Sequence, residues 1–582
     1  MFEKISYKRF CWSLGTTSFR TKNFNRTIET QIAMLNRFWR QPENADEKWE
    51  GNNDVQTRYY EYMQDEGFVD GDAPRPDKDA RQKTSGLVEI GLLNDNRRLT
   101  GAGCALLEIC SKGDFTPDNI FRIEKDSYLY LKQLLKTSCD IDGNIVRPLL
   151  ILLHFLNDPA LDGKVTKEEF TYLLPLCINE DTTEWIGQEI LKLRAGKTSI
   201  DAIINGFIAD KPNYREARNL LMSNAVSEEL ICAVGINRKS PKYDKAYYGL
   251  YNSMLRLYLY RDDSAAKQVL SILNGLTNKK ITTAWKSLQF DTSVTSRIEK
   301  DPFGHFCASN PFCAVTTEDE FKELFFDTMH LYKTKATLSD YCDLNRRYLS
   351  TADIIIFKDD EIKLDVIPEQ LFSLCEDKLY EIAFTKSADL CNDVPLSAIS
   401  GALKVSEELL IEKLGEKFKK KFADLEDAMS EVDKERYARF DKLIDERFAD
   451  DDLINLLGLF EERNDEEISA LVTDNATVPT IFEYVLGIIW YKVSNRKGKV
   501  LDYMKLSLDA NLLPKTHAAG GEADIVYEYP DTQAFPAHHL LLEATLANVG
   551  NQRQMEAEPV TRHLGNNILA TGTGIKTKRA TV

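Results

Sequence analysis

Two short β-forming runs near the C-terminus each carry a single acid at their outer end. The run DIVYEY begins at Asp524, and the run HHLLLE ends at Glu543, with two prolines in the loop between them. Such runs around a loop predict a β-hairpin, in which Asp524 lies beside Glu543. Two carboxylates this close repel each other unless a cation neutralises them, and Mg²⁺ prefers such hard oxygen ligands. The hairpin therefore predicts a metal site, or else two solvent-exposed acids at strand ends.

The segments that flank this hairpin supply further acids. Upstream, IFEYVLGIIWY at 481–491 is a helical run with one acid, Glu483. Downstream, NQRQMEAEPVTRH at 551–563 predicts a helix on which Arg553, Glu556 and His563 share one face. Glu556 can therefore point back toward the hairpin, which gives the predicted site a third acid.

Length and charge limit the wider possibilities. A chain of 582 residues is too long for one core, so several domains are expected. Its net charge of −18 argues against a protein that coats nucleic acid without specificity, but it does not exclude local basic patches. Residues 1–41 contain eight lysines and arginines and only two acids, and residues 559–582 contain four basic residues and no acid. The basic charge is concentrated at the two ends.

Cysteine usage and hydropathy indicate the compartment. The eleven cysteines form no CxxC pair, which fits reduced thiols better than a disulfide framework. The N-terminal MFEKISYKRFCWSLGTT has no uninterrupted apolar core, so it does not resemble a secretory signal. No run of 18 apolar residues occurs, so no membrane span is predicted. We expect a soluble, cytoplasmic protein with no membrane association.

Residues 79–110 predict a winged-helix-like block. A helical run ends near Leu92, Asn94-Asp95-Asn96 makes a turn, and Arg97–Thr100 is a short return strand. Thr100 can cap the helix expected over 101–110. A helix, a polar hairpin tip and a second helix are typical of a winged helix, in which a helix enters the major groove and a basic wing contacts phosphate. A helix–loop–helix inside a helical domain is the alternative.

A second block repeats this plan over residues 344–376. Strands are expected over Ile354–Phe357 and Ile362–Leu364, with a turn at Lys358-Asp359-Asp360 and a helix that opens at Pro368. Its acidic tip makes a poorer phosphate contact than the first block. The two blocks suggest a bipartite recognition region, although one of them can be purely structural.

Residues 405–470 shift to a charged helical composition. Apolar residues recur at steps of three and four from Ile411 to Val432, with charges of both signs elsewhere, which predicts one apolar helical stripe. A charged helix of this kind is most often a solvated connector, so this stretch is the expected linker.

The motifs together resemble a known family. An acid on a helix, an Asp, and then Glu-x-(Lys-like residue) across a hairpin is the layout of PD-(D/E)xK nucleases. The runs SLGTTSFRT (13–21), THAAGGEADIVYEY, LLLEATL and GNQRQMEAEPVTRH resemble the AlwI-like type IIS restriction endonucleases and their strand-nicking relatives, and MEAEPVTRH is the most specific part. The resemblance follows the chain in order, from the N-terminal signature through the winged-helix block and the linker to the nuclease motif.

The resemblance implies roles for particular residues. Asp524 and Glu543 match the metal-binding pair, Glu556 matches the helix acid as a third metal ligand, and Glu483 matches the acid on the preceding helix. Thr545 occupies the usual lysine position, as in relatives, so Arg553 or His563 can partly substitute, or water on Mg²⁺ suffices. His517 is expected to stabilise the turn before Asp524. The predicted catalytic residues are therefore Asp524, Glu543, Glu556, Glu483, Thr545 and His563.

DNA contacts are predicted from the basic residues of the N-terminal region. Phosphate contacts set the register of a protein on DNA, whereas base-edge contacts in a groove set the sequence. We take as candidates Arg20, Lys22, Arg26, Arg81, Lys83, Arg97 and Arg98, and a solvated surface charge is the alternative for each.

The resemblance also implies a fold. We expect a mainly α multidomain protein with winged-helix-like DNA-recognition modules and a C-terminal α/β PD-(D/E)xK nuclease domain. That domain looks C-terminally shortened, because only LGNNILATGTGIKTKRATV follows His563, without a confident closing strand. The expected domains are a DNA-recognition region at 1–185, a second recognition region at 186–400, the linker at 401–472 and the nuclease domain at 473–582.

Three functions follow as alternatives. The first is a Mg²⁺-dependent type IIS endonuclease that cuts a fixed distance outside a short asymmetric site. The second is a strand-nicking enzyme, or the large subunit of a heterodimer that needs a second nuclease subunit. The third is a sequence-specific DNA-binding protein with an inactive nuclease module. The expected partners are double-stranded DNA, a second subunit or transient dimer, and a cognate DNA methyltransferase in a prokaryotic cytoplasm.

Overall fold

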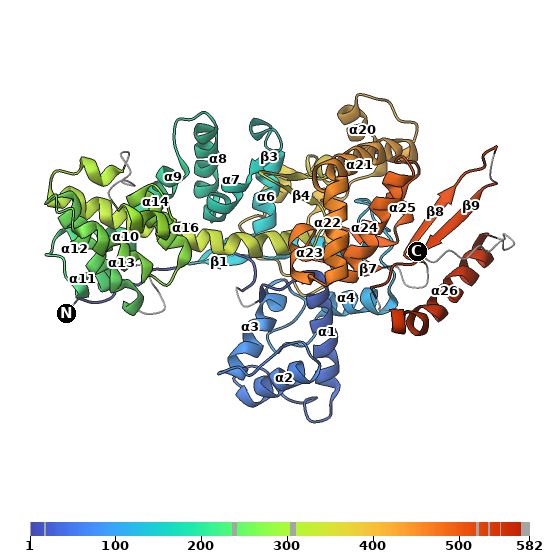
Figure 1. Ribbon diagram of the computed structural model, residues 1–582, viewed down its shortest axis with the longest axis horizontal. Coiled ribbons are helices and arrows are strands. Elements are labelled where there is room, and N and C mark those ends of the chain that lie inside the picture. Colours follow the sequence, from blue (N-terminus) through green and yellow to red (C-terminus); the bar gives the residue numbers. More distant parts are fainter. Residues whose placement is uncertain are drawn as a thin grey trace. The chain divides into compact units, whose positions relative to one another are not determined.

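The computed structural model describes residues 2–16, 19–235, 241–302, 310–518, 523–533, 536–546 and 549–571. It is mainly helical with a few small sheets, as expected, and it divides into two compact units built from segments far apart in the chain (Figure 1). Unit 1 comprises Met1–Ser13, Cys139–Ile151 and Val165–Asp343, and unit 2 comprises Leu14–Ser138, Leu152–Lys164 and Leu344–Val582. The chain passes between the units within α6 (Pro148–Asn157), β3 (Lys164–Thr166) and α16 (Glu318–Ser350).

Unit 1 is almost wholly helical. Its elements are β1 (Cys139–Ile141), β2 (Asn144–Val146), α7 (Lys167–Tyr172), α8 (Glu180–Arg194), α9 (Ile200–Ala209), α10 (Pro212–Met222), α11 (Glu228–Val234), α12 (Ala246–Tyr258), α13 (Ala265–Asn274), α14 (Lys279–Phe290) and α15 (Thr295–Lys300). Polar caps fix several helix starts, because Asn179, Ser199 and Ser227 each accept a backbone N–H of the following first turn.

Unit 2 contains both ends of the chain, together with the predicted hairpin. Its N-terminal helices are α1 (Phe24–Arg40), α2 (Asn53–Asp65), α3 (Pro76–Glu89), α4 (Gly101–Lys112) and α5 (Lys125–Lys136). Its middle elements are β4 (Ile355–Lys358), β5 (Glu361–Leu364), α17 (Val366–Phe372), α18 (Glu376–Tyr380) and α19 (Leu396–Ile399). Its last elements are α20 (Glu407–Phe418), α21 (Leu425–Arg447), α22 (Asp450–Glu462), α23 (Asp465–Leu471), α24 (Val478–Val493), α25 (Val500–Tyr503), β6 (Leu506–Leu508), β7 (Pro514–Ala518), β8 (Ile525–Tyr529), β9 (His538–Leu542) and α26 (Val549–Thr571).

The first predicted block has its two helices and its cap, but hardly any strand. The Thr100 hydroxyl accepts the Gly103 N–H at 3.1 Å and starts α4, as predicted. The expected return strand reduces to one antiparallel bridge between Leu93 and Leu99. Arg97 adopts a φ of 55°, so the backbone turns tightly here instead of extending. The prediction of a strand over Arg97–Thr100 is therefore wrong, and the winged-helix interpretation stays a prediction.

The second block matches its prediction more closely. β4 pairs antiparallel with β5, from Ile355 opposite Leu364 to Lys358 opposite Glu361. The next helix begins at Val366 and not at Pro368, because the Asp365 carboxylate caps it by accepting the Val366 N–H at 2.7 Å. Pro368 occupies the third position of that first turn, where a missing N–H costs nothing.

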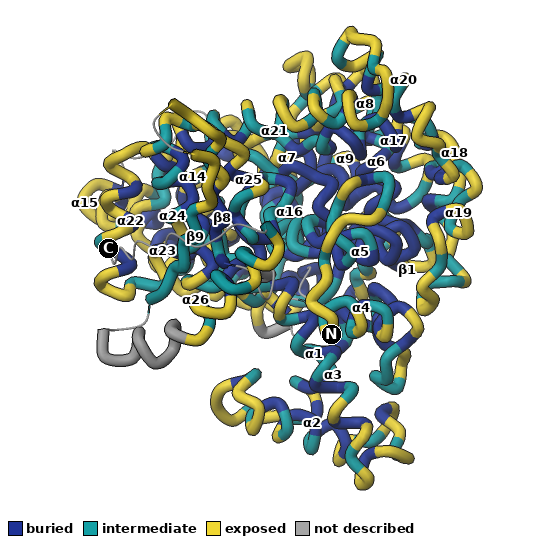
Figure 2. Tube along the Cα trace, turned by 90° about the vertical axis from the view of Figure 1, so that its right-hand side faces the viewer, coloured by how far each residue is buried: buried dark blue, intermediate teal, exposed yellow. Residues whose placement is uncertain are grey.

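The charged stretch is not one continuous helix. Between α20 and α21, Lys419 adopts a φ of 53° and ends the first helix. α20 is largely exposed, in contrast to the buried α5 (Figure 2). The second half of α21 is different, because Phe440 and Ile444 are fully buried in the same hydrophobic core as α24 and β8. Part of the expected linker therefore supports the predicted nuclease region.

That core carries two antiparallel hairpins. β6 pairs with β7, and β8 pairs with β9, with Ile525 opposite Leu542 and Tyr529 opposite His538. An antiparallel bridge between Met504 and Ile525 joins the two hairpins where the segment before β6 meets the start of β8. The predicted hairpin is present, and Figure 1 shows it in orange-red next to the final helix α26.

The remaining expectations concern cysteines and membranes. No disulfide bond joins any two of the ten cysteines in the described part of the chain. Over the described ranges, no helix has the length and apolar character needed to cross a membrane.

Candidate active site

Helix α24 presents Glu483 to the hairpin. The helix starts where the Thr477 hydroxyl accepts the Thr480 N–H, and Pro479 suits its first turn. Gly487 lies one turn after Glu483, and a Cβ there would collide with the Met504 Sδ. The missing side chain thus lets the helix backbone lie directly against the bridge that joins the two hairpins. Glu483 is thereby held close to the start of β8.

The register of the hairpin brings Asp524 and Glu543 together, as the sequence predicts. Ile525 is opposite Leu542, so the next positions outward are Asp524 and Glu543. The Asp524 Oδ2 accepts the backbone N–H of Ala544 at 2.7 Å. Its carbonyl accepts the Lys505 N–H at 2.9 Å, which ties the same residue to the β6 side. The carboxylate of Asp524 is therefore fixed at the open end of the hairpin.

Helix α26 contributes His563 to Glu543. The His563 Nδ1 lies 2.7 Å from the Glu543 Oε1, and both side chains are largely buried, at 10% and 16% exposed. This contact fixes the orientation of the Glu543 carboxylate and leaves its other oxygen for a further partner. His563 therefore belongs to the site through its contact with Glu543. Its predicted role as a partial substitute for the missing lysine stays a prediction.

The electrostatics of Glu483 show that negative charge accumulates at this place. Its pKa is raised to about 8, first by burial and then by the charges of Asp524 and Glu543. Its Oε2 is buried and has no hydrogen-bond partner among the described residues. A buried acid oxygen without a donor is costly, so this carboxyl is held in its neutral form until a cation or a donor arrives.

The other predicted catalytic residues are less well defined. Thr545 lies just beyond the end of β9 and is half-buried. Glu556 and Arg553 lie on α26, and His517 lies on β7, but their side chains fall outside what the structure describes. The role of Glu556 as a third ligand therefore stays a prediction.

The donor set fits a divalent cation of the magnesium type. Across the described part of the chain, no three or more His, Cys, Asp or Glu side chains are placed to hold a metal ion. Mg²⁺ commonly takes one or two protein carboxylates and completes its shell with water and substrate phosphate. Two fixed carboxylates next to a buried acid that lacks a donor match that requirement, whereas a closed protein cage is not formed.

The predicted DNA contacts divide into two groups. Arg20, Lys22 and Arg26 are exposed at and before the start of α1, and Lys83 on α3 is half-buried. The segment that carries the first three is anchored, because the Asn23 N–H donates to the Asp474 carbonyl at 2.6 Å. Asp474 lies shortly before α24, so the basic segment is fixed close to the helix that bears Glu483.

The basic residues of the first block are instead turned to the protein. Arg97 donates to the Thr84 hydroxyl and to the Asp95 carbonyl, both at 2.9 Å, and burial lowers its pKa. Arg98 donates to the carbonyls of Ala45 and Glu47, and it lies 4.3 Å from the Trp39 ring centroid.

On α3, Arg81 pairs with Asp77 at 3.0 Å and also donates to Asn53 and Gln56. The side chains of Arg81, Arg97 and Arg98 therefore hold the fold together here. Their roles in DNA binding remain predictions.

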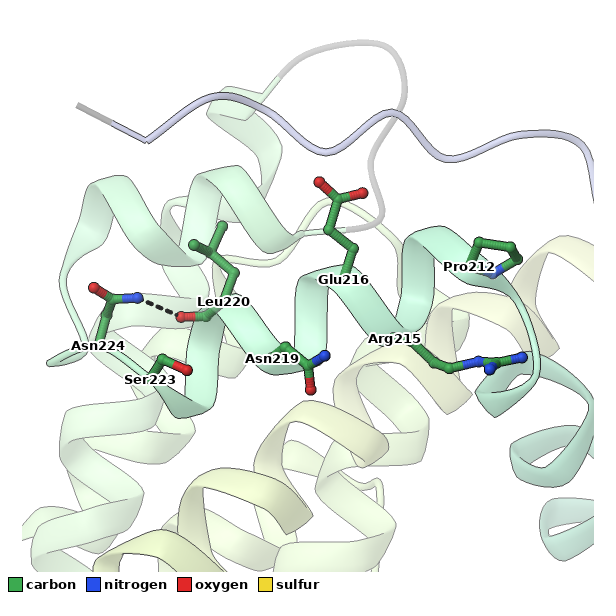
Figure 3. A pocket seen from close by; sticks show the side chains of 7 residues that line it. All are labelled: Pro212, Arg215, Glu216, Asn219, Leu220, Ser223 and Asn224. Atoms are coloured by element: carbon green, nitrogen blue, oxygen red, sulfur yellow. Dashed lines mark hydrogen bonds between the residues drawn. The ribbon is translucent and has the colours of Figure 1, made fainter.

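A surface depression in unit 1 offers a contrast to this site. It follows α10, and its lining consists of Pro212, Arg215, Glu216, Asn219, Leu220, Ser223 and Asn224 (Figure 3). Only one of these residues, Glu216, is an acid, and the Asn224 amide is used to bind the Leu220 carbonyl at 2.8 Å. This depression lacks the paired carboxylates that the hairpin has.

Comparison with known proteins defines the class. A protein-family model described as AlwI restriction endonuclease matches residues 86–571, a range that includes α24, the hairpin and α26. The protein is thus a restriction endonuclease, a hydrolase that acts on DNA. The chain belongs to the AlwI restriction endonuclease family, as its motifs predict. No curated protein matches it.

Three features of the site escaped sequence reasoning. Gly487 has the visible signal of a glycine within an apolar helix, one turn after the only acid of that run. The Ala544 N–H has no sequence signal, because any residue but proline supplies it. The pairing of His563 with Glu543 depends on how α26 packs, although both residues are prominent in their motifs.

Proposed function

We propose that this protein is a Mg²⁺-dependent type IIS restriction endonuclease that hydrolyses DNA phosphodiester bonds at a fixed distance outside a short asymmetric sequence. The observation that supports the proposal is the convergence of Glu483, Asp524 and Glu543 on one place, with the pKa of Glu483 raised to about 8. A fold does not accumulate buried negative charge without a use for it, and perturbed acids of this kind are typical of catalytic sites.

Asp524 and Glu543 are the residues that would hold the cation. Each has one oxygen fixed by the protein, through the Ala544 N–H and the His563 ring respectively. Fixed ligands lose little entropy when they bind, so the site is organised before the substrate arrives. Bound Mg²⁺ supplies neutralisation of the carboxylates, polarisation of the scissile phosphate and greater acidity of a nearby water.

Glu483 acts through its proton. Near neutral pH its carboxyl is protonated, because the two neighbouring carboxylates and burial disfavour the anion. A cation held by Asp524 and Glu543 would reduce that penalty, and Glu483 would then release its proton to solvent. We propose that Glu483 would then add its negative charge to the site, and that Glu556 on α26 is the third metal ligand.

DNA binding is assigned to the exposed basic residues of the N-terminal segment. Arg20, Lys22 and Arg26 would contact phosphates and set the register, because phosphate contacts position a protein on DNA without reading sequence. Lys83, on the neighbouring helix α3, is a further candidate. A short asymmetric target sequence is predicted from the family resemblance alone, and no side chain is assigned to read its bases.

A plasmid assay tests the proposal directly. Supercoiled plasmid with many sequence contexts is incubated with the protein and Mg²⁺, and then with EDTA in place of Mg²⁺. Linear product with Mg²⁺ alone is the expected outcome, and sequencing of the ends gives the site and the offset. A gel shift without any cleavage would refute the enzymatic proposal and favour a DNA-binding protein with an inactive module.

A strand-nicking activity is the second candidate function. It is favoured because the described residues contain one such carboxylate centre, and one centre cuts one strand at a time. Double-strand cleavage then needs a transient dimer or a second nuclease subunit. Open circles as the final product, with no linear DNA at high protein concentration, would identify the nicking enzyme. In either case a cognate methyltransferase would protect the host sequence.

A further inference from the structure

A buried cluster of one lysine and several acids lies at the β6–β7 hairpin, whereas the carboxylates of the candidate site lie at the β8–β9 hairpin. Lys515 on β7 is only 1% exposed, and its Nζ lies 3.1 Å from the Glu124 carboxylate and 4.0 Å from that of Asp126. Its shortest contact is an ion pair with Asp353, which is itself buried. The Ser127 hydroxyl contacts the same Nζ at 3.0 Å.

The members of this cluster come from three distant parts of unit 2. Glu124 directly precedes α5, and Asp126 and Ser127 lie in its first turn. Asp353 follows α16 just before β4, and Lys515 belongs to β7 of the β6–β7 hairpin. Ser507 of β6 adds a second link, because its hydroxyl donates to Glu124 at 2.7 Å. A single lysine thus joins the start of α5 to the β6–β7 hairpin, which meets the β8–β9 hairpin at the Met504–Ile525 bridge.

The cluster matters for the free energy of unfolding because its charged groups are buried and one ammonium faces three acids. Burial by itself lowers the pKa of Lys515, but Asp353, Asp126 and Glu124 raise it well above its usual range, so the ammonium stays charged. Removal of one partner from a buried ion pair is strongly destabilising, since it leaves an uncompensated charge. Without Lys515, three acids would face one another in the interior.

A short path of backbone contacts leads from Lys515 to Asp524. β7 pairs with β6, with Leu506 opposite Ala518 and Leu508 opposite Pro514. The residue before β6, Lys505, donates its N–H to the Asp524 carbonyl at 2.9 Å. The turn between β6 and β7 is also held by α24, because the Tyr484 hydroxyl donates to the Leu512 carbonyl at 2.9 Å. Any shift of β7 therefore reaches both Asp524 and the helix that bears Glu483.

We propose that Lys515 is a positioning residue for the carboxylate site, and that it couples the N-terminal helices to the chemistry by fixing β7 against α5. The inference rests on the proposed nuclease function and names how that site is controlled. α5 packs on α4, and α4 packs on α1, so DNA seated on the basic segment before α1 would be sensed at this lysine. Lys515 does not contact the reacting atoms.

The decisive variant is Lys515→Met, with Lys136→Met as the matched control. Lys136 is also fully buried and lies at the end of α5, but its Nζ donates to the carbonyls of Asp389 and Asn392 at 3.1 and 2.6 Å. Both variants remove one buried ammonium. Only Lys515→Met is expected to lower the single-turnover cleavage rate, by about 10²-fold, because small displacements at a catalytic site have effects of this size.

A milder variant keeps the test valid if Lys515→Met fails to fold. Asp353→Asn removes the nearest carboxylate, and asparagine tolerates the φ of 50° found there. Lys515 keeps Glu124 and Asp126, so we expect a loss in cleavage rate of about tenfold with DNA affinity within about twofold of the parent. A purely structural role would lower the melting temperature in both Asp353→Asn and Lys136→Met without this split between rate and affinity.

A second readout separates this inference from the proposed function. The melting temperature of the parent protein is measured with and without Mg²⁺, since cation binding to the carboxylates stabilises the fold. Lys136→Met should keep that shift, and Lys515→Met or Asp353→Asn should lose most of it. A parent protein that shows the shift but cuts no DNA contradicts the nuclease proposal alone. Equal rates and equal shifts in the Lys515 and Lys136 variants overturn the positioning role.

Discussion

The short hairpin turn of the first block, closed by the single Leu93–Leu99 bridge, and the β8–β9 hairpin use their charged residues in opposite ways. In the first, Arg97 and Arg98 donate to a hydroxyl and to carbonyls of the surrounding loops, and Arg98 also stacks on Trp39. In the second, Asp524 and Glu543 lie at adjacent strand ends, and burial together with these two charges raises the pKa of Glu483 to about 8. The first turn pairs its charged groups with partners inside the protein, and the second brings acidic side chains from two strand ends and a helix to one place.

This difference in pairing distinguishes charged residues that stabilise the fold from charged residues that bind a ligand. A charge whose partners are all within the protein contributes to stability, and its removal is expected to loosen the fold. A charge that the fold leaves uncompensated costs stability, and its removal is expected to stabilise the metal-free protein while function is lost. The predictions below test this distinction, beginning with the largest expected effect.

The largest effect is expected from Asp524. Asp524→Asn keeps an oxygen for the Ala544 N–H but removes the charge, so cleavage should fall by about 10³-fold or more. Specific DNA binding should persist, measured by gel shift without Mg²⁺, and can even tighten, because one repulsive carboxylate is gone. Asp524→Ala should abolish cleavage in the same way. Asp531→Asn, in the exposed loop of the same hairpin, is the control and should cut normally.

A loss of DNA binding in proportion to the loss of cutting would contradict this reading of Asp524. It would mean that the carboxylate shapes the DNA-binding surface, and the contrast between the two hairpins would then fail at its central residue.

Glu483 should show a pH-dependent effect on both stability and metal binding. A carboxyl whose pKa is higher in the fold than in the unfolded chain contributes stability at low pH, and this contribution is lost as pH rises through about 8. Metal-free Glu483→Gln should therefore melt a few degrees (~2–4 °C) higher than the parent at pH 9, and about the same at pH 5. The Mg²⁺ concentration needed for cleavage should fall from pH 7 to pH 9 in the parent only.

The cleavage rate of Glu483→Gln at saturating Mg²⁺ should be reduced by about 10²-fold. Scanning calorimetry in EDTA and a Mg²⁺ titration at both pH values provide the measurements. A parent protein whose Mg²⁺ requirement does not change between pH 7 and pH 9 would remove Glu483 from the cation site.

Glu556 tests the part of the site that rests on sequence alone. Glu556→Gln should depress cleavage by about tenfold under limiting Mg²⁺, because the amide keeps the size but loses the charge that Mg²⁺ needs. Glu558→Gln is the matched control, since Glu558 is exposed and pairs with Arg562 at 3.0 Å on the same helix. Equal activity of the two variants would leave Glu483, Asp524 and Glu543 as the acids of the site.

The sequence predicts those parts of the fold that local chemistry decides. The β8–β9 hairpin follows from its two β-forming runs and their prolines, and the start of α4 follows from Thr100 as a cap. The break at Lys419 and the burial of Phe440 do not follow, because both depend on which face α21 packs against α24. The charged, periodic stretch at 405–470 predicts a connector, because the sequence does not show which distant residues pack against it.

The candidate site shows the same limit. The pairing of Asp524 with Glu543 could be predicted, because antiparallel register alone brings strand ends together. The contact of His563 with Glu543 and the cluster around Lys515 could not, because their members are 20 to 391 positions apart and no local pattern links them. The hydrogen bonds of Arg98 to the carbonyls of Ala45 and Glu47 could not be predicted either, because these partners lie far away in the sequence.

The smallest effects should distinguish Arg97 from Arg26. Arg97→Ala removes two hydrogen bonds and leaves Thr84 and Asp95 without this donor, so it should lower the free energy of unfolding by roughly 1–2 kcal/mol. Arg26 is exposed on the first turn of α1, so Arg26→Ala should leave stability unchanged. Instead it should weaken DNA binding uniformly across sequences and reduce the slope of log affinity against log salt by about 0.9.

Denaturant unfolding and a salt series of gel shifts give both quantities for both variants. If Arg97→Ala changes the salt slope and leaves stability intact, the first hairpin contacts phosphate after all, and its arginines must leave their internal partners when DNA binds. If Arg26→Ala lowers stability instead, the N-terminal segment is structural. The contrast between compensated and uncompensated charge holds only if each variant affects the quantity assigned to it and leaves the other unchanged.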